Sequence, residues 1–134
     1  MEETAYAPLM ENLMQAGYTV YLMRMPFHLA IFDVNAADQV IEQQKDIHEW
    51  YMMGHSLGGA MAASYTAKHS DQITGLVLLG AYSTADLSQK DVEVLSIYGS
   101  QDGVLNRKKY EAEKKNLPSD FTEYVIEGGN HAGY

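Results

Sequence analysis

The chain has 134 residues, a formal net charge of −9 and no cysteine. The acidic balance argues against nucleic acid and anionic membrane as partners, because both attract basic surfaces, and the lack of cysteine excludes disulfides and thiolate metal sites. Neither a membrane-spanning apolar stretch nor a signal peptide is apparent, so the chain reads as soluble as written.

Helical and strand-like patterns alternate along the chain, without repeats or an evident linker. In chain order we predict a helix over residues 4–16, a strand over 18–23, a helix over 35–44, a strand over 50–53, a helix over 59–68, strands over 74–79 and 91–98, a helix over 107–116 and a strand over 122–127. The continuous apolar run at 74–79 is typical of a parallel strand near the centre of a sheet. This alternation predicts one α/β domain over residues 1–134, a three-layer, mostly parallel sheet flanked by helices.

The stretch Gly54-His55-Ser56-Leu57-Gly58 lies between a predicted strand and a predicted helix. A serine on such a sharp strand-to-helix turn is typical of a nucleophile elbow. We expect glycine to be required at positions 54 and 58, because a side chain at either position would collide with the neighbouring strand and helix.

An acid and a base that could activate this serine follow later in the chain. Asp102 comes just after the predicted strand 91–98, and His131 follows the strand 122–127 in the loop Gly128-Gly129-Asn130. Parallel strands end at one edge of the sheet, so the order Ser56, Asp102, His131 fits an acyl-transfer triad.

Several spaced stretches together resemble the α/β-hydrolase superfamily, most closely the uncharacterised bacterial hydrolases of the dienelactone-hydrolase-like kind. These stretches are Tyr6-Ala-Pro-Leu, Met25-Pro-Phe, Gly54-His-Ser-Leu-Gly-Gly-Ala-Met-Ala-Ala, Tyr98-Gly-Ser-Gln-Asp-Gly-Val-Leu-Asn and Glu127-Gly-Gly-Asn-His-Ala. The resemblance implies a triad of Ser56, Asp102 and His131, with the N–H of Leu57 as one donor of the oxyanion hole. Longer relatives often carry a membrane anchor, so the compartment stays open between the cytoplasm and a protein clipped from a membrane-anchored parent.

Against the family pattern, we expect a truncated core that lacks the first strands and the C-terminal helix. The loop that supplies the second oxyanion donor would then be missing, and loss of one donor typically lowers the rate by about 10²–10³. The resulting gap would leave an exposed sheet edge, and exposed edges favour pairing with another chain. We therefore expect a homo-oligomer.

Each candidate residue also has a simpler structural explanation. Ser56 could cap the following helix through its side chain, Asp102 could serve the turn that Asp-Gly sequences favour, and His131 could be a solvated loop residue. His55 is expected to pack behind the elbow, and the apolar run 25–32 either lines an acyl pocket or fills the core. The histidine spacings do not match a zinc motif, so we predict neither a metal nor a cofactor.

Taken together, the sequence predicts a serine hydrolase that cleaves carboxylic esters or thioesters through an acyl-enzyme. The alternatives are a non-catalytic binding or assembly module with an incomplete oxyanion hole, and an acyltransferase that uses the same three residues.

Overall fold

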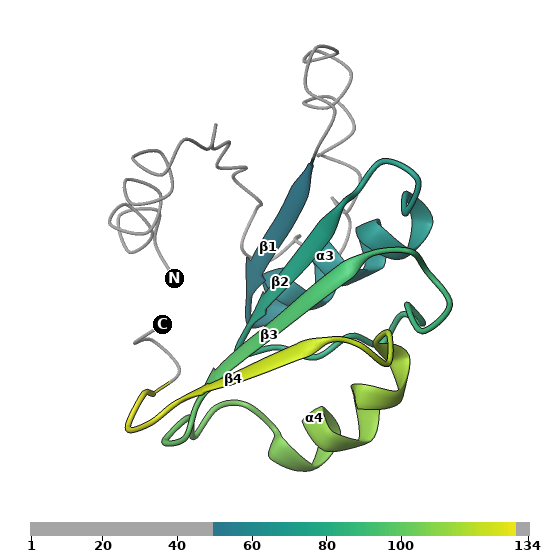
Figure 1. Cartoon of the computed structure of the whole chain (residues 1–134). Helices are drawn as coiled ribbons and strands as arrows, with labels where there is room; N and C mark the ends of the chain where they lie inside the picture. Colours follow the sequence, from purple (N-terminus) through teal and green to yellow (C-terminus); the bar gives the residue numbers. More distant parts are fainter. Residues whose placement is uncertain (1–49, 131–134) are drawn as a thin grey trace.

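A computed structural model of the chain describes residues 50–130 (Figure 1). Along the chain it contains β1 (Tyr51–His55), α3 (Leu57–Lys68), β2 (Gly75–Leu79), β3 (Glu93–Gly99), α4 (Arg107–Glu113), the short 3₁₀ helix η3 (Lys114–Asn116) and β4 (Thr122–Ile126). The elements predicted over residues 4–16, 18–23 and 35–44 lie outside the described residues. The predicted run of two helices and four strands from residue 50 onwards is confirmed, with bounds that differ by a few residues and with the second helix divided into α4 and η3.

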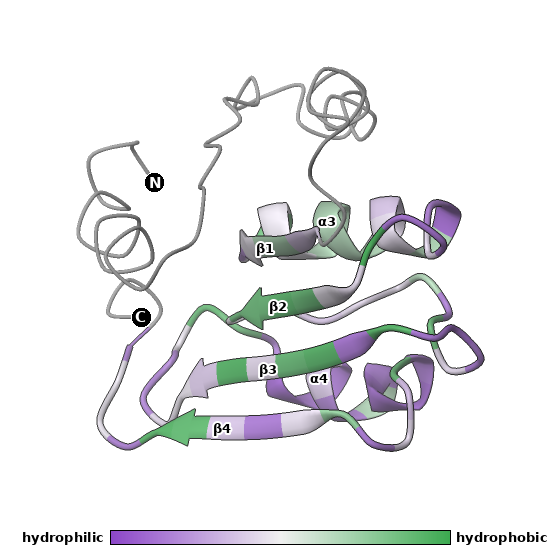
Figure 2. Ribbon diagram, turned by 45° about the horizontal axis from the view of Figure 1, so that its top comes forward, coloured by the Kyte–Doolittle hydropathy of each residue, from purple (hydrophilic) through white to green (hydrophobic). Residues whose placement is uncertain are grey.

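The four strands form one parallel sheet in the order β1-β2-β3-β4. Gly54 pairs with Leu78, Leu78 with Ser96, and Ser96 with Glu123, so these four positions form a row across one face of the sheet. All four arrows in Figures 1 and 2 point toward the same edge of the sheet. We call this the carboxyl edge, because β1 to β4 end there.

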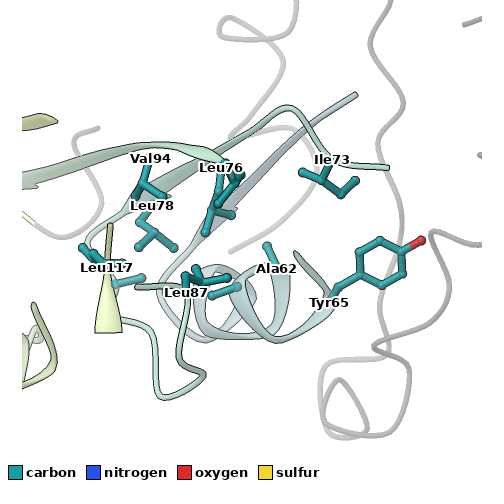
Figure 3. Close-up of a cluster of buried hydrophobic side chains, with 11 residues drawn as sticks. Ala62, Tyr65, Ile73, Leu76, Leu78, Leu87, Val94 and Leu117 are labelled. Carbon is teal, nitrogen blue, oxygen red and sulfur yellow. The ribbon is translucent and has the colours of Figure 1, made fainter. Parts of the chain in front are cut away.

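The hydrophobic core lies between the sheet and its helices. Leu76 and Leu78 of β2 are 1% exposed, and they cluster with Ala62 of α3 and Leu117, which follows η3 (Figure 3). A continuous apolar strand buried in this way confirms the central position predicted for residues 74–79. Full burial of a leucine side chain stabilises the fold by about 1.5–3 kcal/mol.

Helices α3 and α4 cover the same face of the sheet. Ala62 of α3 packs in the cluster that contains Leu78, while Tyr110 of α4 bonds to Ser96, the neighbour of Leu78 in the row across the sheet. The two helices differ in composition, since α3 consists largely of apolar and small residues whereas most residues of α4 are hydrophilic (Figure 2).

Residues 107–116, predicted as one exposed and charged helix, form α4 followed by η3. Asn106 begins α4 as its N-cap, because its side chain accepts a hydrogen bond from the N–H of Lys109 at 3.0 Å. The prediction of a fully exposed helix is wrong at Tyr110, which is 2% exposed. Within residues 50–130, no helix is long and apolar enough to cross a membrane.

Candidate active site

Ser56 lies between the last residue of β1 and the first residue of α3. Its backbone has φ 57° and ψ −124°, and it is the one non-glycine residue with positive φ among residues 50–130. Its N–H donates to the carbonyl of Leu79 at 2.9 Å, and its carbonyl accepts from the N–H of Gly59 at 3.0 Å. The turn is therefore held from both sides, which fits the strained strand-to-helix geometry expected from the sequence.

The glycines around Ser56 have different roles. A Cβ on Gly54 would lie 2.3 Å from the carbonyl oxygen of Gly58, so this glycine is sterically required, as predicted. The prediction is wrong for Gly58, where a Cβ would meet no described atom within 4 Å. The second close contact is at Gly59, whose Cβ would lie 2.5 Å from the Cβ of Ala81. Gly59 meets a residue far along the chain, and no local pattern signals that contact.

The helix-cap explanation of Ser56 does not hold, because its side chain makes no capping hydrogen bond to α3. The following residue, Leu57, is 53% exposed and is the first residue of the helix. The first N–H groups of a helix have no intrahelical acceptor, and none is found for Leu57 within the described part of the chain. This donor belongs to the residue that directly follows Ser56 in the chain.

Asp102 lies in the loop after β3, at the carboxyl edge, and is 5% exposed. Its Oδ1 accepts hydrogen bonds from the N–H groups of Val104 at 2.9 Å and Leu105 at 2.8 Å. This is the turn chemistry that the Asp-Gly sequence indicated. Since a carboxylate has two oxygens and about four acceptor positions, the turn role leaves room for a second role.

His131 lies outside the described residues, and the description stops at its neighbour Asn130. The loop that leads to it is joined to the Asp102 loop by backbone contacts: the N–H of Gln101 donates to the carbonyl of Gly129 at 2.8 Å. A Cβ on Gly99 would lie 2.1 Å from that same carbonyl oxygen, so the two loops are in direct contact.

The other histidines and carboxylates of residues 50–130 form no metal site. Among the residues that the structure describes, no group of three His, Asp or Glu side chains could hold a metal ion. His69, beyond the C-terminal end of α3, stacks on Tyr65 with ring centroids 4.2 Å apart. His55 is the partly buried last residue of β1.

A family model described as "Alpha/beta hydrolase family" matches residues 1–134. The chain belongs to the α/β-hydrolase family. In α/β hydrolases the nucleophile lies on a strained strand-to-helix turn at this edge of the sheet. The resemblance expected from the sequence is thereby confirmed for the superfamily, while the dienelactone-hydrolase-like subtype stays a prediction.

Relatives of this α/β hydrolase include a proline iminopeptidase from Elizabethkingia meningoseptica, which is 29% identical over 93 residues. That match covers 66% of this chain and 31% of the relative, so the chain spans about a third of that relative's length.

Two solved structures share the fold. The first, a monoacylglycerol lipase from Paleococcus ferrophilus, gives a TM-score of 0.80 at 16% identity, over 97% of this chain and 81% of that one. The second, an esterase domain of a Rhodothermus marinus protein, gives a TM-score of 0.76 at 13% identity, over 98% of this chain and 72% of that one.

Proposed function

We propose that this α/β hydrolase is a serine hydrolase that cleaves carboxylic esters or thioesters with Ser56 as nucleophile, Asp102 as acid and His131 as base. The observation that carries the proposal is the backbone of Ser56. A non-glycine residue held at φ 57° and ψ −124°, with no capping role for its side chain, stores strain of about 1–3 kcal/mol. Such strain is concentrated at functional positions, and here it presents a hydroxyl beside a helix N-terminus.

In the proposed reaction, His131 removes the proton from Ser56 Oγ as the oxygen attacks the substrate carbonyl carbon. The carbonyl oxygen takes the negative charge, and the N–H of Leu57 donates to it. Asp102 orients the imidazole and stabilises its protonated form. His131 then gives its proton to the leaving alcohol or thiol, and the acyl group stays on Ser56. Water, activated by the same histidine, releases the carboxylic acid.

Two features of the described residues support pairing Asp102 with His131. The two loops that carry them follow adjacent parallel strands, β3 and β4, and they are joined by the Gln101–Gly129 hydrogen bond. The buried position of Asp102 would also strengthen its interaction with an imidazolium, because charges interact more strongly when water is excluded.

An ester or thioester is the proposed substrate class because both release a better leaving group than an amide. The proteins similar to this chain include both a lipase and an iminopeptidase, so the choice needs a direct test. We expect p-nitrophenyl acetate to be hydrolysed faster than an amino-acyl p-nitroanilide. The reverse order would assign the site to peptide substrates.

The decisive experiment is covalent labelling with a fluorophosphonate, followed by peptide mass spectrometry. An activated serine reacts with this probe, so we expect an adduct on Ser56 in the wild-type chain and none in S56A. The labelling rate should rise between about pH 5 and 8 as the base deprotonates, and this rise should be absent from H131A. A flat profile in a reactive preparation would exclude His131 as the base.

Absence of the adduct from folded protein would instead favour a non-catalytic binding module. If the adduct forms but added alcohols appear as ester products in preference to the free acid, the chain is an acyltransferase.

A further inference from the structure

The loop after β3 is joined to β4 and the loop after it by several hydrogen bonds, and two of these involve Ser100. The N–H of Ser100 donates to the carbonyl of Ile126 at 2.9 Å. Its hydroxyl oxygen accepts the N–H of Gly128 at 2.8 Å. One residue of the Asp102 loop therefore binds both the end of β4 and the turn that follows it.

The carbonyl of Ser100 is also engaged, by the side chain of Arg107. Nη2 of Arg107 donates to this carbonyl at 2.6 Å and to the carbonyl of Gly99 at 3.2 Å. The guanidinium carbon lies 4.8 Å from the centre of the Tyr98 ring, which the cation covers. A planar guanidinium fixed by two acceptors and an aromatic ring has little freedom to move.

These contacts hold the segment that contains Asp102. Arg107 is the first residue of α4, and its side chain donates to the carbonyls of Gly99 and Ser100. In the middle of this segment, the Asp102 carboxylate accepts hydrogen bonds from the N–H groups of Val104 and Leu105. The segment from Gly99 to Arg107 is thus held at its start, in its middle and at its end, and Ser100 connects it to the turn of Gly128.

We propose that Ser100 and Arg107 are positioning residues that set the distance and orientation between Asp102 and His131. This inference rests on the proposed function of the same site. Neither side chain needs to touch the substrate. Ser100 fixes the His131 loop against the Asp102 loop, and Arg107 fixes the Asp102 loop against α4. A misplacement of about 1 Å between reacting groups lowers rates by about 10²-fold, so loosening this link should affect turnover before it affects substrate binding.

The test compares S100A with S100T, because threonine retains a hydroxyl that can accept the Gly128 N–H. For S100A we expect kcat for an ester to fall about tenfold with KM within about twofold of wild type, since orientation and not binding is lost. S100T should recover most of that loss. The matched control is S88A, which removes an exposed loop hydroxyl that donates to Asp86 Oδ1 at 2.6 Å and joins no second loop. Its kinetics should be unchanged.

The arginine is tested in the same way, with R107M, R107K and the neighbouring control K108M. Lysine keeps the charge but lacks the planar fork, so we expect R107K to fall between wild type and R107M in kcat. K108M removes an exposed positive charge from the same helix and should behave as wild type. If S100A melts at a much lower temperature, S100T and R107K still decide the question.

The two proposals fail in different ways. If wild type labels on Ser56 and turns over esters while S100A and R107M keep full kcat, the positioning roles are wrong and the serine hydrolase stands. If wild type neither labels nor turns over, the proposed function fails, and amide hydrogen exchange of residues 127–130 then decides the link. Faster amide exchange of these residues in S100A than in S88A would support the link between the two loops through Ser100, and equal exchange rates in the two variants would overturn it.

Discussion

Ser56 is held in a backbone conformation that an unconstrained serine rarely adopts. Two kinds of contact maintain it: the hydrogen bond from its N–H to Leu79 and the close approach of Gly54 to Gly58. The strain is therefore supported by neighbouring backbone and not by the serine side chain, which leaves the hydroxyl available for chemistry. Changes at the neighbouring glycines should show which contacts matter.

At Gly54 we expect alanine to be destabilising, and at Gly58 we expect it to be neutral or stabilising. G54A places a methyl group 2.3 Å from a backbone oxygen, an overlap that typically costs about 1–3 kcal/mol. G58A adds a methyl group with no described atom within 4 Å, and replacing glycine by alanine inside a helix such as α3 stabilises the fold by about 0.5–1 kcal/mol. Urea unfolding of both variants measures the difference, and equal losses would show that both glycines are sterically required.

For Asp102, the turn and the chemistry can be separated by one isosteric change. Asparagine retains an oxygen that can accept the N–H groups of Val104 and Leu105, so D102N should unfold at nearly the wild-type urea concentration. It removes the negative charge, so kcat should fall by on the order of 10³–10⁴. D102A removes both the hydrogen-bond acceptor and the negative charge, so this variant should also be less stable than wild type. Wild-type turnover in D102N would reduce Asp102 to a turn residue.

At this scale, the sequence predicted residues whose chemistry depends on their immediate neighbours. Ser56 and Asp102 each stand in a short pattern, Gly-x-Ser-x-Gly or Asp-Gly after a strand, that indicates their turns. Gly59, Ser100 and Arg107 could not be found in this way. The partners of Gly59 and Ser100, Ala81 and Gly128, lie far along the chain, and an arginine at a helix start is usually solvated.

Among the elements, α4 and β4 are joined by a polar network on the helix-covered face of the sheet. Tyr110 Oη donates to Glu123 Oε2 at 2.6 Å and lies 2.8 Å from Ser96 Oγ. Lys114 Nζ lies 2.9 Å from the same oxygen of Glu123. Burial, followed by the hydrogen bond to Glu123, raises the pKa of Tyr110. Partial burial of Glu123 opposes its ionisation, but the bonds from Tyr110 and Lys114 outweigh it and lower its pKa.

This network predicts an acid-sensitive attachment of β4. Because the pKa of Glu123 is lowered in the folded state, its contribution to stability is present above its ordinary value of 4.5 and is lost as the pH falls through the folded-state pKa. At pH 7, E123Q should be less stable by up to about 1 kcal/mol, a small effect because the side chain is 29% exposed and solvent screens the pair. The difference in the free energy of unfolding between wild type and E123Q, measured by urea unfolding, should shrink as the pH is lowered toward 3.

The control for this measurement is E93Q. Glu93 is an exposed strand residue that forms no ion pair within residues 50–130, so its replacement should change stability little at any pH. If E123Q and wild type differ by the same amount at pH 3 and pH 7, the carboxylate does not stabilise β4 through its charge.

A helix or strand could be predicted where the spacing of apolar residues in its segment matched one type of secondary structure. The continuous apolar run of β2 and the small-residue pattern of α3 left little ambiguity. The sequence predicted the helix at α4 but not which of its side chains is buried against the sheet. Its one large ring, Tyr110, is buried, and the Tyr110 hydroxyl donates to Glu123 of β4 and lies within hydrogen-bond distance of Ser96 of β3.

For the whole molecule, the charge distribution is uneven although the net charge is −9. Five of the nine basic residues of the chain lie between Arg107 and Lys115, over α4 and η3, and the rest of the sequence is more strongly acidic. Part of this basic group serves internal contacts, since Arg107 binds loop carbonyls and Lys114 binds Glu123 and Glu111. The expectation that phosphate-rich partners are disfavoured therefore stays a prediction, as does the expected homo-oligomer.

The strand order has one more consequence, for synthesis of the protein. Each strand from β1 to β4 is laid beside the one made just before it, so a chain emerging from the ribosome can extend this sheet outward without waiting for a distant partner. The segment that bears the proposed base follows β4. If Ser56 and His131 act as proposed, a nascent chain would carry its nucleophile before its base, and hydrolysis would begin only after β4 has docked.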